Sequence, residues 1–120
     1  MNATITPYYL ELILLKDCVY SNKALSLVKE LGINHRKITV SENKDRYKTK
    51  QTDTFPRILL KRHNRVGDVF IGGYDDLYKL YQLFYKKSYN EDKVKKYMDE
   101  YKMDKHTVLR LIQLINISIN

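Results

Sequence analysis

The fold of this chain is decided by three short stretches: Lys16-Asp17-Cys18-Val19-Tyr20-Ser21, Thr54-Phe55-Pro56 and Ile71-Gly72-Gly73-Tyr74-Asp75-Asp76. The first follows a strongly apolar run and leads into residues spaced for a helix. The second opens another apolar run, and the third joins a short apolar run to a second helical pattern. This placement predicts an α/β domain in which the three stretches lie at the ends of strands.

Apolar spacing outside these stretches predicts the other elements. Strands are predicted at residues 8–16, 35–40, 56–61 and 66–71. Helices are predicted at residues 21–31, with apolar positions Ala24, Leu25, Val28 and Leu31, and at residues 75–86, with Leu77, Leu80, Tyr81 and Phe84. Gly32 is the expected stop of the first helix, residues 41–51 predict one weak helix, and residues 62–65 predict a hairpin turn. A parallel crossover unit is thus followed by a hairpin that a helix closes.

Residues 88–120 form a predicted C-terminal helical extension to a domain of residues 1–87. Asn90 can cap a helix at residues 91–101, and Asp104 can cap another. The apolar face of that last helix is predicted to consist of Val108, Leu111, Ile112 and Ile115. A face so apolar requires burial, either on the domain or against a second copy of the chain.

Composition limits the classes of function. The 120 residues suit one domain with a modest core, and no apolar run is long enough to cross a bilayer. The first residues lack the pattern of a secretory signal. The formal charge of +8 raises nucleic acid as a partner, but the basic residues are spread out and acids lie among them. We therefore expect a solvated basic surface, with neither nucleic acid nor a membrane as partner.

Cys18 is the single cysteine, which excludes an intramolecular disulfide and favours a reducing, cytoplasmic location. It follows a predicted strand and precedes a predicted helix, so that free N–H groups and the positive helix end lie near its sulfur. Lys16 adds a cation close by. Both effects should lower the pKa of the thiol and make Cys18 nucleophilic. The three histidines are scattered and predict no metal site.

Together the three stretches resemble the active site of the glutaredoxins, the glutathione-using branch of the thioredoxin-like fold. Tyr20 matches an aromatic residue that the family often carries two positions after its cysteine. Thr54-Phe55-Pro56 is similar to the family's Thr-Val-Pro, in which a cis peptide bond precedes the proline. Residues 72–76 are similar to its Gly-Gly-x-Asp-Asp run. Ser21 stands where the second cysteine of a Cys-x-x-Cys pair would be, which is the monothiol arrangement. The resemblance covers residues 8–87.

The resemblance implies a thioredoxin-like fold, with a four-stranded mixed sheet flanked by helices, and a glutathione site around Cys18. The main chain of Phe55 would pair with the cysteinyl backbone of glutathione, in the manner of an added strand. The N–H groups of Tyr74 and Asp75 would bind the γ-glutamyl carboxylate, and the Asp75 carboxylate would accept from the ammonium group. The full set of implied glutathione-binding residues is Lys16, Tyr20, Thr54, Phe55, Pro56, Gly73, Tyr74 and Asp75.

The implied activity is that of a monothiol oxidoreductase that reduces protein–glutathione mixed disulfides (deglutathionylation) through Cys18, with glutathione as co-substrate and glutathionylated or other thiol proteins as partners. One alternative is a homodimer that carries a [2Fe–2S] cluster on its two cysteines and two bound glutathiones, as several Cys-x-x-Ser glutaredoxins do. A second alternative is an interaction module that retains the fold alone. The basic segment 61–68 is either a tolerated insertion or a site for an acidic partner.

Overall fold

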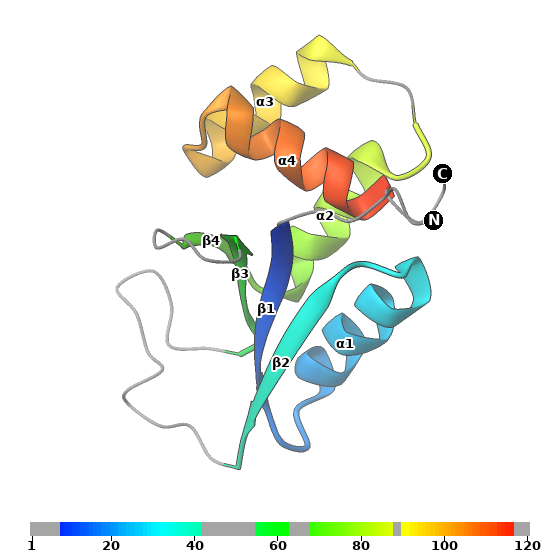
Figure 1. The fold of residues 1–120 in the computed structure, drawn as a ribbon, viewed down its shortest axis with the longest axis vertical. Coiled ribbons are helices and arrows are strands. Elements are labelled where there is room, and N and C mark those ends of the chain that lie inside the picture. The colour runs from blue at the N-terminus through cyan, green and yellow to red at the C-terminus, as the bar shows by residue number, and fades with distance from the viewer. Residues whose placement is uncertain (1–7, 42–54, 63–67, 88–89, 117–120) are drawn as a thin grey trace.

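The computed structural model of the chain describes residues 8–41, 55–62, 68–87 and 90–116. Eight elements follow one another in these residues (Figure 1): β1 (Tyr8–Leu15), α1 (Val19–Leu31), β2 (His35–Val40), β3 (Arg57–Arg62), β4 (Val69–Gly72), α2 (Tyr74–Phe84), α3 (Glu91–Tyr101) and α4 (Lys105–Asn116). Apart from Ser41 and Arg62, the predicted weak helix at 41–51 and the predicted turn at 62–65 lie outside the described residues. The other predicted elements are present, with ends that differ by a few residues.

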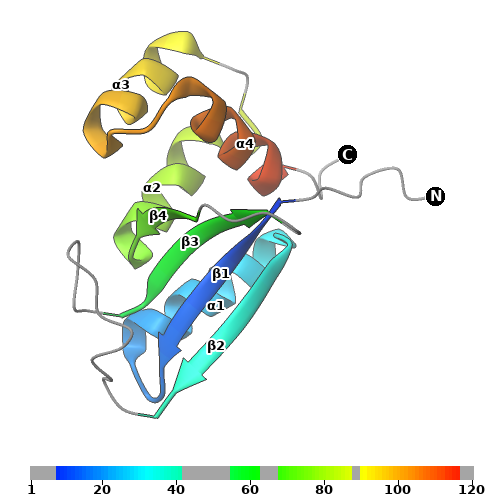
Figure 2. The same cartoon turned by 60° about the vertical axis from the view of Figure 1, so that its left-hand side comes forward.

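The strands form one mixed sheet in the order β2-β1-β3-β4. β1 pairs with β2 in parallel and with β3 in antiparallel fashion, and β3 and β4 are antiparallel. Figure 2 shows β1 in the interior of this sheet, hydrogen-bonded along both edges. The predicted α/β class with a four-stranded mixed sheet and helices is therefore confirmed.

One face of the sheet builds the core together with the helices. Leu10, Leu12 and Leu14 alternate along β1 and are almost completely buried, as the two-residue period of a strand requires. They belong to one hydrophobic cluster with the buried side chains of α1 and α2, which are Ala24, Leu27, Val28, Leu31, Leu77, Leu80 and Phe84. The two helices pack on each other as well as on the sheet.

Three residues predicted on the apolar helix faces are less buried than expected. Leu25, Tyr81 and Ile112 are only partly buried, whereas Leu27 and Leu114 are buried instead. Each misplaced residue lies on the edge of an apolar stripe that is broad enough to admit either neighbour. The rotation of a helix about its axis depends on what it packs against, and this information is absent from its own sequence.

The C-terminal helices α3 and α4 belong to the same hydrophobic cluster as the sheet. Their buried side chains are Val94, Tyr97, Val108, Leu111, Leu114 and Ile115. In Figures 1 and 2, α4 lies against α2 and the start of β1, and α3 packs on α4. The apolar face of α4 therefore finds its burial within the chain.

Both ends of α2 are held by side chains from this extension. Near its first turn, the Tyr101 hydroxyl of α3 donates to the Asp76 carboxylate. At its other end, the Asn116 side chain of α4 donates to the Phe84 carbonyl over 3.1 Å and accepts from the Lys86 N–H over 2.9 Å. α2 ends at Phe84, two residues before the predicted end, where Asn116 provides partners for main-chain groups that a longer helix would satisfy itself.

The predicted helix caps are present. Gly32 ends α1 in the left-handed conformation, with φ of 69°. The side chain of Asn90 accepts from the Lys93 N–H at the start of α3 over 3.0 Å, and that of Asp104 accepts from the Thr107 N–H at the start of α4 over 2.8 Å. No helix in the described ranges is long and apolar enough to cross a membrane.

Candidate functional site

The sheet register brings the three sequence stretches to one end of the sheet. β1 ends at Leu15, three residues before Cys18. Ile13 of β1 pairs with Arg57 at the start of β3, and Ile58 pairs with Gly72 at the end of β4. The Cys18 turn, the Phe55–Pro56 turn and the start of α2 must therefore lie near the same end of the sheet.

Cys18 is the residue that caps the N-terminus of α1. It has extended backbone angles, its N–H donates to the Leu15 carbonyl over 3.2 Å, and its carbonyl accepts from the Asn22 N–H over 3.0 Å. Asp17 has φ of 61° and makes the turn between strand and helix. The cysteine is half-buried. These bonds fix the sulfur in front of the first turn of α1.

The electrostatics of this position favour the thiolate. Burial raises the pKa of Cys18, but hydrogen bonds from the Ser21 hydroxyl and from the N–H groups of Ser21 and Tyr20 outweigh burial, and the pKa lies below its ordinary value. A thiolate with three donors at a helix start is the form in which cysteine attacks disulfides. Lys16, which the sequence suggested as a second cause, is exposed and is not among the groups that lower the pKa.

Ser21 has a role that sequence reasoning missed. Its side chain is fully buried, and its hydroxyl oxygen accepts the Leu15 N–H over 3.0 Å while the hydroxyl is hydrogen-bonded to the Cys18 sulfur. The serine thus links the end of β1 to the thiolate. Its position three residues after a helix cap is where a side chain can reach back to the cap, a signal that was available in the sequence.

The second stretch forms a tight turn at the start of β3. The Phe55–Pro56 peptide bond is cis, as the resemblance implied, and both residues are buried. The guanidinium carbon of the buried Arg57 lies 4.2 Å from the centre of the Phe55 ring. Thr54, which was also assigned to the site, lies outside the described residues.

The third stretch begins α2 and touches the second. A Cβ atom added at Gly73 would lie 3.5 Å from the carbonyl oxygen of Pro56. Gly73 caps the helix, and its N–H donates to the Asp76 carboxylate over 2.8 Å. The first hydrogen bond within the helix is donated by Leu77 to the Gly73 carbonyl. The N–H groups of Tyr74 and Asp75 precede that bond and have no partner within the helix, so that they are positioned to donate to an acceptor in front of the helix start.

Two neighbouring aspartates have different roles here. The Asp75 side chain is exposed and available to a ligand. The Asp76 carboxylate is committed within the protein, since it accepts from Gly73 N–H and from the Tyr101 hydroxyl. Burial and this bond raise the pKa of Tyr101 above its usual range. Sequence reasoning missed Asp76 because one of its partners comes from α3.

Aromatic contacts join the Cys18 helix to α2. The ring centres of Tyr20 and Tyr74 are 6.3 Å apart, and the Lys23 ammonium lies 5.5 Å and 5.9 Å from them. Val19 and Tyr20, the two residues after Cys18, are 63% and 55% exposed, so that two large hydrophobic side chains face solvent next to the cysteine. Lys23 also lines an open groove of about 440 Å³ that runs between α1 and α2 past Tyr78. It adds a cation that the sequence did not single out.

The residues around Cys18 offer few ligands for a metal ion. The described ranges contain no group of three or more His, Cys, Asp or Glu side chains that could hold a metal ion. An iron–sulfur cluster is held by cysteine thiolates, and one chain supplies the single thiolate of Cys18. The donor set fits a [2Fe–2S] cluster only if a second copy and two glutathione sulfurs complete it.

Comparisons with known proteins leave the family open. No protein-family model and no curated protein sequence matches the chain.

We expect Gly72→Ala to destabilise the fold by about 2 kcal/mol or more. Gly72 has φ of 137°, and a Cβ there would lie 2.0 Å from the Asp76 carboxylate oxygen, so the change strains the backbone and displaces the cap. Gly73→Ala is the matched control, because its Cβ meets only an ordinary contact; its cost should not exceed about 1 kcal/mol. Urea unfolding measures both. Equal losses in the two variants would contradict this account of the turn.

We expect Ser21→Ala to move the reactivity of Cys18 to higher pH. Because the folded pKa of Cys18 is lowered by hydrogen bonds, the first from the Ser21 hydroxyl, losing that donor raises the pKa and leaves less thiolate at neutral pH. The pH profile of alkylation by iodoacetamide reports this directly. Asn22→Ala, at an exposed position beside Ser21, should keep the original profile. An unchanged profile in Ser21→Ala would show that the Ser21 hydroxyl does not lower the pKa of Cys18.

Proposed function

We propose that the chain is a monothiol, glutathione-dependent oxidoreductase with the thioredoxin-like arrangement of a glutaredoxin. The observation that carries the proposal is the single half-buried cysteine with a lowered pKa, beside two other ligand-binding features at the same end of the sheet. One is the main chain of the Phe55–Pro56 turn, and the other is the free helix start at Tyr74. An activated thiol alone has many uses, but its placement next to an anion site and a free main chain suits a thiol peptide with carboxylates.

The parts of glutathione match the groups that surround Cys18. Its cysteinyl main chain would pair with the main chain of Phe55. Its γ-glutamyl carboxylate would accept from the N–H groups of Tyr74 and Asp75, and its ammonium group would donate to the exposed Asp75 carboxylate. Lys23 and Lys16 are the cations near this surface, available to the glycyl carboxylate. Asp76 is not available, because Gly73 and Tyr101 occupy its carboxylate.

The reaction proceeds by two thiol–disulfide exchanges. The Cys18 thiolate attacks the glutathione sulfur of a protein–glutathione mixed disulfide; that disulfide breaks, and the target protein leaves as a thiolate that takes a proton. Cys18 is then joined to glutathione. The thiolate of a second glutathione attacks the bound glutathione sulfur, which releases oxidised glutathione and restores the Cys18 thiolate. The helix start that stabilises Cys18 as the attacking group also makes it a good leaving group in the second step.

Ser21 determines which route is open. It cannot form a disulfide with Cys18, so an intermediate between Cys18 and a target protein has no internal partner to resolve it. The same side chain donates to the thiolate. The chain is therefore suited to glutathione mixed disulfides and not to protein disulfides, and it needs a compartment rich in reduced glutathione, such as the cytoplasm.

The test is turnover of a glutathionylated peptide with excess glutathione. The purified protein should accelerate release of the peptide thiol, and Cys18→Ser should reduce the rate to that without protein, because the attacking sulfur is gone. Lys29→Gln, an exposed change at the far end of α1, should keep full activity. Equal rates in the presence of wild type and Cys18→Ser would refute the proposal. A brown, glutathione-dependent dimer without turnover would assign the site to cluster carriage, and neither signal would leave a binding module.

A further inference from the structure

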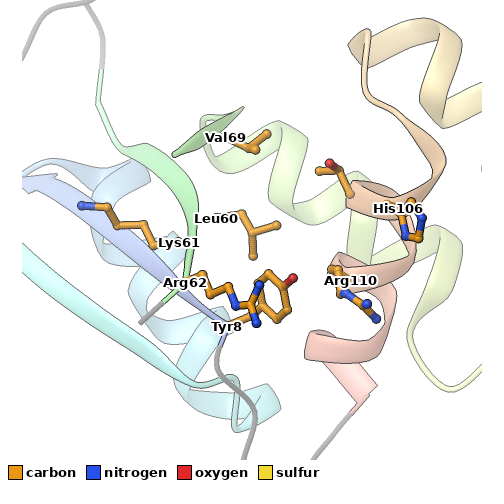
Figure 3. A pocket seen from close by; sticks show the side chains of 8 residues that line it. Tyr8, Leu60, Lys61, Arg62, Val69, His106 and Arg110 are labelled. Atoms are coloured by element: carbon orange, nitrogen blue, oxygen red, sulfur yellow. The ribbon is translucent and has the colours of Figure 1, made fainter. Parts of the chain in front are cut away.

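A second pocket lies at the opposite end of the sheet from Cys18. It has a volume of about 190 Å³ and is formed where β1 begins, β3 ends and β4 begins, with the first two turns of α4 as its outer wall (Figure 3). Tyr8, Leu60 and Val69 give it an apolar floor, and Arg62 and Arg110 reach into it from β3 and α4. The length of β1 separates it from the cysteine by about 20 Å or more. It is therefore independent of the proposed glutathione site.

Two guanidinium groups converge in this pocket on one aromatic ring. The guanidinium carbon of Arg62 lies 5.5 Å from the centre of the Tyr8 ring, and that of Arg110 lies 5.6 Å from it. The two groups are therefore no more than about 11 Å apart, and Figure 3 shows them on either side of Tyr8. The ring holds both side chains by cation–π contact, and no other described residue occupies their N–H groups.

Among the residues that the structure describes, acids do not compensate the charges of these two arginines. Within the ranges that the structure describes, no carboxylate forms an ion pair with Arg62 or Arg110. The neighbouring Lys61 is different, since it pairs with Glu11 over 3.2 Å and with Asp68 over 3.5 Å. Like charges held close together repel each other, and the arrangement is stabilised when an anion binds near both.

The start of α4 adds to the positive electrostatic potential of this pocket. His106 and Thr107 line the pocket in the first turn of this helix, whose N-terminal end carries partial positive charge. Asp104, which directly precedes α4, is committed to the cap of this helix: it accepts from both the N–H and the hydroxyl of Thr107. It does not line the pocket.

We propose that this pocket binds a small phosphate monoester. The phosphoryl group would accept from the N–H groups of Arg62 and Arg110, whose planar guanidinium groups suit the oxygens of a dianion. Its organic part would contact Leu60, Val69 and the Tyr8 ring. A cavity of about 150 Å³ holds a benzene molecule, so a pocket of about 190 Å³ has room for a group of that size. A nucleic acid strand would need an extended basic groove instead, and this pocket is compact.

The experiment is a titration of the isotope-labelled protein with phenyl phosphate, followed by the amide resonances. Saturable shifts are expected at Leu60, Val69, Thr107 and Arg110. Arg62→Gln and Arg110→Gln should each weaken binding about tenfold, as expected for loss of a charge-assisted contact. Both side chains are exposed, so that the variants should fold. Arg36→Gln, on the edge strand β2, removes the same charge elsewhere and should leave the affinity unchanged.

Three results would overturn the proposal. One is the absence of saturable shifts in the pocket. Another is equal weakening by Arg36→Gln, which would show that only net charge matters. The third is an oligonucleotide that shifts these amides while phenyl phosphate does not, which would make the pocket part of a nucleic-acid surface. Phenol and benzoate should bind more weakly than phenyl phosphate, because the first lacks charge and the second carries one charge instead of two.

Discussion

The position of β1 in the interior of the sheet is the constraint on which the rest of the structure depends. β1 is hydrogen-bonded to β2 on one edge and to β3 on the other, and its alternate leucines are buried under α1 and α2. A shift of β1 by one residue would turn those leucines to the opposite face. The register is therefore fixed, and it places the Cys18 turn, the Phe55–Pro56 turn and the start of α2 together. The site is a consequence of the sheet.

The C-terminal extension contributes to the site as well as to the core. Tyr101 of α3 and the Gly73 N–H share the Asp76 carboxylate, so that the conformation of the helix start is held from outside the sheet domain. Asn116 of α4 holds the other end of the same helix. The extension thus fixes α2 at both ends, which keeps the N–H groups of Tyr74 and Asp75 oriented for a ligand. Its removal would expose the apolar surface of α2 and β1 that α4 covers, and would also release this helix start.

Much of the fold follows from local sequence signals. The strand at residues 8–16, the caps at Asn90 and Asp104, and Gly32 as a helix stop were all predicted, because each depends on residues close together in the chain. The site was predicted less completely. The roles of Cys18 and the start of α2 were inferred locally, but the shared Asp76 carboxylate needs Tyr101, and the pairing of Arg62 with Arg110 around Tyr8 needs three separate elements. Lys16 was predicted to lower the pKa of Cys18 because it is close in the sequence, but in the structure this residue is exposed to solvent.

The central claim is that three separate stretches form one glutathione site, and the most direct measurement is the change in amide resonances when Cys18 is joined to glutathione. The account predicts shifts at Phe55, Tyr74 and Asp75 in addition to those around Cys18, because the bound peptide would contact all three stretches. Protein alkylated with iodoacetamide at Cys18 provides the matched control for local effects of modification. Shifts confined to residues 16–22 in both samples would contradict the claim, since glutathione would then be attached to the cysteine without being bound.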